Sequence, residues 1–186
     1  MIIKFHKVNL KKKFPLQISR GTHYESQNVF IEIIEEGITA WGESAPGKTE
    51  GATSAIEVEE ALANLIGEGI EGLSIYEVYQ KGRELKTPPC ALAGLDIALW
   101  DLKAKKAKLE LNDLLGIPKS TTPTSITVGI NPPEIIKERV GLILNDKQVK
   151  AIKIKLGSPN GIEYDKEIYS QVFESTKSSN ISIRVD

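Results

Sequence analysis

The sequence predicts an α+β domain followed by the first three β/α units of a TIM-like (β/α) barrel. Three observations favour this architecture. Residues 2–43 hold alternating strand segments, residues 53–115 hold helical periodicity, and residues 120–186 alternate strands with helices. Strands that alternate with helices are typical of parallel sheets with right-handed crossovers. We therefore expect a first domain at residues 1–119 and the N-terminal part of a barrel domain at residues 120–186.

The composition narrows the class of protein. Hydrophobic residues make up 40% of the 186 residues and charged residues 26%, which favours a packed core over disorder. The net charge of −1 gives no electrostatic reason for a nucleic-acid partner, and no apolar run approaches membrane-spanning length. A single cysteine, Cys90, excludes an internal disulfide, fits a reducing cytoplasm and is expected to be a buried packing residue.

The first domain is expected to begin with an antiparallel meander. Its strand segments alternate in polarity, and the last two are joined by the turn signal Glu36-Gly37. The predicted strands are residues 2–10, 28–35 and 39–43. The basic residues 11–13 are interpreted as a solvated strand end, and residues 19–23 as a polar loop.

Helices follow the meander. Their predicted ranges are residues 53–66, 74–85, 91–106 and 111–115. The third is predicted to be strongly amphipathic, because Leu92, Leu95 and Leu99 recur on one face at helical spacing. Asp96 and Asp101 lie on the same helix, and we expect them to be exposed or capping carboxylates.

The second region has strands in which apolar and polar residues alternate. The strands are predicted at residues 124–130, 149–156 and 181–186, with helices near residues 132–144 and 161–177. A doubly wound sheet is covered on both faces and should be apolar on both. A barrel explains the alternation. The apolar face of each strand packs against the outer helices, and the polar groups point inward near the C-terminal mouth of the barrel. An antiparallel sheet with one wet face also fits, although the intervening helices disfavour it.

Two lysines are set into the central strand of this region. Lys153 and Lys155 share one face, because side chains alternate along a strand. Neighbouring ammonium groups repel each other and lose hydration when covered, which favours a neutral amine that can act as a base. The alternative is an edge strand that shows its lysines to water. The residues themselves leave both interpretations open.

Several segments match one family in order along nearly the whole chain. They are residues 42–46 (GESAP), 93–102 (AGLDIALWDL), 114–116 (LLG), 152–157 (IKIKLG) and 183–186 (IRVD). On these segments the chain resembles the enolase superfamily in its muconate-lactonizing branch. Residues 18–22 and 127–130 are similar to those of dipeptide epimerases, which include the L-Ala-D/L-Glu epimerases.

The resemblance implies a capping domain on a modified barrel and a Mg²⁺-assisted reaction. In that reaction the proton α to a carboxylate of a dipeptide is removed and returned through an enediolate. By family match, Lys155 is the acid/base and Lys153 favours its neutral amine and binds the substrate carboxylate. Asp186 is a Mg²⁺ ligand, as its carboxylate oxygens suit that ion. Arg20 contacts the distal end of the substrate, and Thr127 lines the pocket.

Three strands cannot close an eight-stranded barrel. The family's other metal carboxylates and its second lysine belong to later strands. We therefore expect an N-terminal portion of a longer enzyme, inactive alone, that forms a homo-oligomer or is completed by a C-terminal segment or a second chain. The alternatives are muconate cycloisomerase or o-succinylbenzoate synthase chemistry on the same fold, and a non-catalytic binding module.

Overall fold

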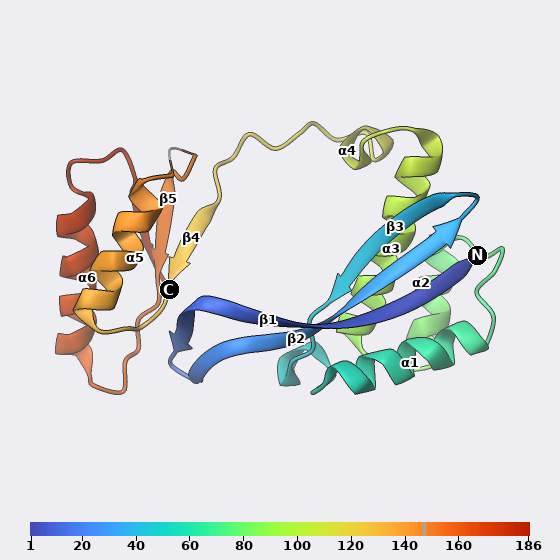
Figure 1. Cartoon of the computed structure of the whole chain (residues 1–186), viewed down its shortest axis with the longest axis horizontal. Coiled ribbons are helices and arrows are strands. Elements are labelled where there is room, and N and C mark those ends of the chain that lie inside the picture. Colours follow the sequence, from blue (N-terminus) through green and yellow to red (C-terminus); the bar gives the residue numbers. More distant parts are fainter. Residues whose placement is uncertain (147) are drawn as a thin grey trace. The chain divides into compact units, whose positions relative to one another are not determined.

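The computed structural model describes residues 1–146 and 148–186, which form two compact units (Figure 1). The first unit holds Met1–Leu10 and Ser26–Lys119. The second unit holds Lys11–Glu25 and Ser120–Asp186. The second unit therefore combines an N-terminal segment with the C-terminal part of the chain. The domains predicted at residues 1–119 and 120–186 stay a prediction.

An antiparallel sheet forms the start of the chain, as the meander pattern predicts. Its strands lie in the order β1 (Ile2–Ile18), β2 (Gly21–Glu35) and β3 (Ile38–Ser44). In the β2–β3 hairpin Ile31 lies opposite Gly42. The connecting residues Glu36 and Gly37 have φ angles of 51° and 77°, and two left-handed residues match the natural twist of a tight hairpin.

The first two strands are longer than predicted. The structure continues β1 through Lys11–Lys13 to Ile18, so the interpretation of these lysines as a strand end is wrong. A two-stranded ribbon exposes side chains to water on both faces, and lysines are common on such strands. Polar and apolar residues therefore need not alternate there, and the sequence pattern no longer shows that the segment is a strand. We call Lys11–Glu25, which groups with the second unit, the hairpin arm.

Four helices follow in the first unit, and the first two begin at serine side-chain caps. They are α1 (Ala55–Gly67), α2 (Ile75–Glu84), α3 (Pro89–Ala107) and α4 (Leu111–Leu114), after a short 3-10 turn at Lys48–Glu50. Ser74 accepts from Glu77 N at 3.2 Å while Glu77 accepts from Ser74 N at 2.7 Å, which forms a capping box. No helix in the described part of the chain is long and apolar enough to cross a membrane.

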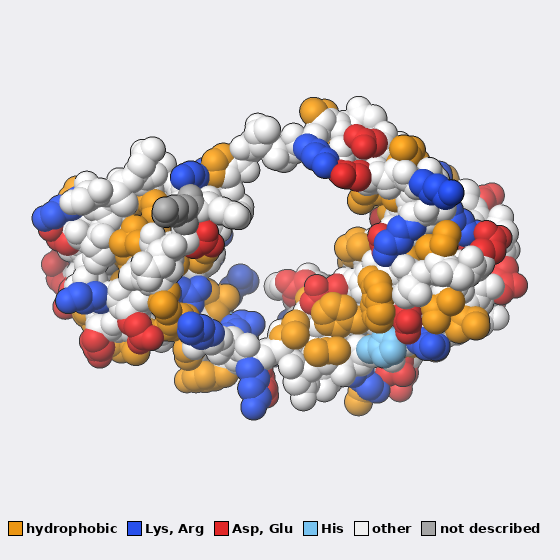
Figure 2. Space-filling view, turned by 45° about the horizontal axis from the view of Figure 1, so that its top comes forward, with side chains coloured by type: hydrophobic (Ala, Val, Ile, Leu, Met, Phe, Trp, Pro, Cys, Tyr) orange, Lys and Arg blue, Asp and Glu red, His pale blue; other side chains and the backbone are white. Residues whose placement is uncertain are grey.

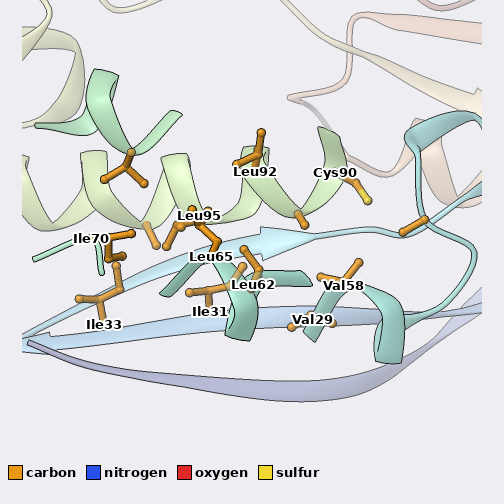
Figure 3. Packing of buried hydrophobic residues seen from close by; sticks show 14 of the residues in the cluster. Val29, Ile31, Ile33, Val58, Leu62, Leu65, Ile70, Cys90, Leu92 and Leu95 are labelled. Carbon is orange, nitrogen blue, oxygen red and sulfur yellow. The ribbon is translucent and has the colours of Figure 1, made fainter. Parts of the chain in front are cut away.

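The core of the first unit lies between β2 and two helices (Figure 3). Val29, Ile31 and Ile33 alternate along β2 and are fully buried. They face side chains of α1 and α3, among them Val58, Leu62, Leu65, Leu92 and Leu95. Cys90 belongs to the same cluster, as predicted for a packing residue. Each fully buried aliphatic side chain stabilises the unit by roughly 1.5–3 kcal/mol.

Helix α3 approaches the edge strand β3 more closely than side chains would normally allow. A Cβ atom on Gly42 would lie 2.0 Å from the carbonyl oxygen of Gly94 on the helix. Asp101 accepts a hydrogen bond of 2.8 Å from the backbone N–H of Trp41. Asp101 therefore satisfies an edge-strand donor from the interior of α3, so it is a partly buried packing contact and not a helix cap. Asp96 is partly buried instead of exposed, and this desolvation raises the pKa of its carboxyl.

A parallel sheet with two helices forms most of the second unit (Figure 1). Its elements are β4 (Ser125–Val128), α5 (Pro133–Leu144), β5 (Ala151–Ile154), α6 (Ile162–Thr176) and β6 (Ser182–Val185). The strands pair in chain order, β4-β5-β6, and both pairs are parallel. The predicted β-α-β-α-β order is therefore confirmed, and the antiparallel alternative is excluded for these strands.

The close approach of α3 to β3 gives a first prediction. We expect Gly42→Ala to destabilise the first unit by about 2 kcal/mol or more, because its Cβ would collide with backbone. The matched control is Gly67→Ala in α1, where no heavy atom lies within 4 Å, and it should be neutral or stabilise by up to about 1 kcal/mol. Trp41 and Trp100 are the two tryptophans and both lie in the first unit, so their fluorescence during urea unfolding measures the effect. Equal midpoints for the two variants would contradict the packing argument.

Candidate active site at the carboxyl ends of the parallel strands

The register of the parallel sheet places polar residues in one row. Thr127 lies opposite Lys153, and Lys153 lies opposite Arg184. The neighbouring rows are apolar, with Ile152 and Ile154 fully buried in the core that includes α5 and α6. Because side chains alternate along a strand, the polar row faces away from these helices. This arrangement is the one that the alternation in the sequence predicts.

The two lysines of the central strand meet one acid. The Nζ atoms of Lys153 and Lys155 lie 2.7 and 2.9 Å from Oδ2 of Asp186. The parallel ladder fixes this acid, since Asp186 N donates to Ile154 O at 2.9 Å and Leu156 N donates to Asp186 O at 2.9 Å. The lysine side chains are 34% and 24% exposed, so both are partly withdrawn from water. A single carboxylate thus offsets the repulsion between two ammonium groups.

The lysines also set the ionisation of the acid. Hydrogen bonds from Lys153 and then Lys155 lower the pKa of the Asp186 carboxyl from 3.8 to about 2. The group is therefore ionised at neutral pH and offers hard oxygen atoms of the kind that Mg²⁺ prefers. Among the described residues no group of three or more His, Cys, Asp or Glu side chains could hold a metal ion. Asp186 fits Mg²⁺ as one ligand of a larger set.

A buried acid holds the loop that follows the lysine strand. Asp165, at the start of α6, is 7% exposed. Its carboxylate oxygens accept from Gly157 N at 2.9 Å and from Ser158 N at 3.0 Å. Gly157 has a φ angle of +86°, which glycine adopts readily. Asp165 is not among the residues predicted from the sequence, although an acid in the first turn of a helix after a Gly-containing loop is the available signal.

The remaining predicted site residues occupy different positions in the same unit. Thr127 lies on β4 beside Lys153, whereas Arg20 lies in the turn between β1 and β2. The hairpin arm that carries Arg20 contacts the loop after β4, where Ile130 N donates to Gln17 O at 2.9 Å. Among the described residues, the Arg20 side chain forms no hydrogen bond or ion pair with the other candidates. Figure 2 shows Lys and Arg side chains on the visible face of both units.

Known proteins resemble the chain over its whole length. It is 56% identical over 186 residues to a hydrophobic dipeptide epimerase from Flavobacteria bacterium (strain MS024-2A), covering all of this chain and 53% of that protein. It is 46% identical over 186 residues to a hydrophobic dipeptide epimerase from Roseobacter litoralis, again over all of this chain and 54% of the relative.

A solved structure supports the same relationship. The dipeptide epimerase of Enterococcus faecalis V583, complexed with Mg and the dipeptide L-Leu-L-Tyr, matches with a TM-score of 0.85 and 28% identity. The match covers 99% of this chain and 52% of that chain. The present chain therefore spans about half the length of the relatives that it matches.

The family model for the mandelate racemase / muconate lactonizing enzyme N-terminal domain matches residues 2–116. These residues contain the antiparallel sheet and the helices α1 to α4, so the predicted capping fold is confirmed. Together with the lysine pair and Asp186 on the parallel strands that follow, the match shows that the chain belongs to the mandelate racemase / muconate lactonizing enzyme family of the enolase superfamily.

Proposed function

We propose that the whole protein is a dipeptide epimerase that removes and returns the proton α to a carboxylate. The observation that carries the proposal is the cluster of Lys153, Lys155 and Asp186 at the carboxyl ends of parallel strands. The similarity to two hydrophobic dipeptide epimerases supports it. The segment that completes the site would come from the rest of the same polypeptide or from another chain.

The two lysines take different roles in this proposal. Lys155, in its neutral form, accepts the α-proton at Nζ, and the electron pair left on carbon spreads onto the substrate carboxylate. Lys153 holds that carboxylate through its ammonium group, where growing negative charge strengthens the interaction. An acid in the segment that completes the site would then donate a proton to the opposite face of the carbon, which inverts its configuration. Because the α-proton is very weakly acidic, a positioned base is required.

Asp186 would supply one oxygen ligand to Mg²⁺. The bound ion provides positive charge that stabilises negative charge on the substrate carboxylate. The Mg bound in the structure of the relative from Enterococcus faecalis supports this choice of ion.

We propose a small dipeptide as the substrate. The names of the two similar relatives favour hydrophobic dipeptides, and the Enterococcus faecalis structure holds L-Leu-L-Tyr. Thr127 would line the pocket beside Lys153, and Arg20 would contact the distal end of the dipeptide. L-Ala-L-Glu belongs in the same assay, since the sequence also resembles L-Ala-D/L-Glu epimerases.

The ion-pair cluster predicts a measurable titration in this chain. The Asp186 carboxyl should protonate with a midpoint of about 2, and Lys153→Met should move that midpoint towards 3.8 because the strongest hydrogen bond is lost. Side-chain carboxyl shifts in NMR spectra recorded as the pH is lowered report the change. Lys166→Met, which removes an exposed lysine paired with Glu163 on α6, is the control and should leave the midpoint unchanged. A midpoint near 3.8 in the unmodified chain would contradict the cluster.

The proposed base predicts a loss of proton exchange. In the whole protein, Lys155→Ala should slow exchange of the substrate α-proton with deuterium from solvent by at least about 100-fold. L-Leu-L-Tyr and L-Ala-L-Glu with Mg²⁺ serve as substrates, and NMR follows the exchange. Lys166→Ala should exchange at the unmodified rate, because this lysine lies exposed on α6. Fast exchange in a folded Lys155→Ala variant would remove Lys155 from the role of base.

The proposed ligand predicts weaker metal binding. Asp186→Asn should lower the affinity of the whole protein for Mg²⁺ by at least about tenfold, since a charged oxygen ligand is replaced by a neutral amide. Isothermal titration calorimetry measures this directly and without substrate. Glu174→Gln, an exposed acid on α6, is the matched control. Equal affinities for all three proteins would show that Asp186 is not a ligand.

A further inference from the structure

We propose that Arg139 is a positioning residue that fixes the hairpin arm, and with it Arg20, against the strand that carries Thr127. The inference rests on the proposed function, because Arg20 and Thr127 are its candidate substrate contacts. Neither the sequence pattern nor the family match singles out Arg139, which lies on the outer helix α5.

Arg139 contacts the arm and β4 at the same time. Its guanidinium carbon lies 5.0 Å from the centroid of the Phe14 ring, which belongs to the arm. Its Nη2 donates a hydrogen bond of 2.6 Å to the backbone oxygen of Thr127. A planar guanidinium can stack on an aromatic ring through its face and donate through its edge, so both contacts are compatible. The side chain is therefore a bridge between the two elements.

The charge of Arg139 has no acidic partner. No carboxylate forms a salt bridge with it in the part of the chain that the structure describes, and its buried Nε has no acceptor. Burial lowers the pKa of the guanidinium. A partly buried cation without a carboxylate partner costs desolvation energy that an apolar side chain of similar length avoids. Stability of the core therefore does not account for an arginine here, whereas fixing the arm does.

The loop after β4 also contacts the hairpin arm. Ile130 N donates to Gln17 O at 2.9 Å, and Asn131, which is 7% exposed, reaches Pro15 O at 3.5 Å through its Nδ2. A Cβ atom on Gly129 would lie within 3.0 Å of the backbone of Gln17. Any residue with a side chain at position 129 would therefore clash with the backbone of the arm.

The loop after the lysine strand also meets the arm. A Cβ atom on Gly157 would lie 3.3 Å from Cβ of Ser19, the residue before Arg20. The arm thus rests on the loops that follow both Thr127 and Lys155. Fixing a binding group before the ligand arrives removes the entropy cost of ordering it on binding. Arg139 contacts Thr127 and Phe14 and forms no hydrogen bond or ion pair with Lys155 or Asp186 in the part of the chain that the structure describes, so its effect should fall on binding and not on proton transfer.

The first test separates binding from chemistry in the whole protein. Arg139→Met should raise KM for the dipeptide about tenfold, the equivalent of one lost contact, while kcat stays within about twofold. Arg139→Lys keeps the charge over Phe14 and should recover part of the KM. Lys137→Met, an exposed lysine on the same helix, should match the unmodified enzyme. An unchanged KM, or a loss of kcat as large as the change in KM, would overturn the positioning role.

The second test needs no catalysis. Lys11, Lys12, Lys13 and Arg20 are trypsin sites within the arm. Arg139→Met should speed cleavage at these sites in this chain by about tenfold, because the arm opens more often, and Lys137→Met should not. Mass spectrometry of the fragments identifies the cut sites. Unchanged cleavage would overturn the docking. An unmodified whole protein without epimerase activity would refute the proposed function, and the trypsin assay would then decide the docking alone.

Discussion

Two positive charges on one face of a strand stay close together only where an acid neutralises them. Asp186 forms salt bridges with both Lys153 and Lys155, and the fold of the second unit holds it in this position. Its position depends on the parallel register of β5 and β6, which in turn depends on the isoleucines packed beneath α5 and α6. The chemistry of the cluster is thus a consequence of hydrophobic burial on the opposite face of the same sheet.

The alternation of polar and apolar residues predicted most of this arrangement. It indicated the strands of the second unit, the shared face of the two lysines and the helices between them, because periodicity reports which face is buried. It could not indicate Asp165, whose partners are backbone N–H groups of a loop. A backbone donor carries no side-chain identity, so its acceptor leaves little trace in the sequence. Asp101 was expected to be exposed or capping. Its partner is a backbone N–H group of an edge strand 60 positions away, and a backbone donor of this kind could not be predicted from the sequence either.

The hairpin arm shows where sequence periodicity fails. Residues 11–18 carry lysines, a proline and a phenylalanine without a clear period, and the structure nevertheless makes them a strand. The stabilising contacts of this segment come from residues more than 100 positions away, such as Ile130 and Arg139. Local propensity therefore predicted the wrong end for β1, because long-range contacts extend the strand to Ile18. The roles of Arg20 and Thr127 remain predictions that follow from the family resemblance.

The pleat of the arm restricts how its length can vary. Successive side chains of a strand point to opposite faces, so one inserted residue in β1 before Phe14 would turn that ring away from Arg139. Two inserted residues would restore the facing but shift the ring by about 7 Å along the strand. Insertions that keep this contact therefore lie beyond Ser19, in the turn itself.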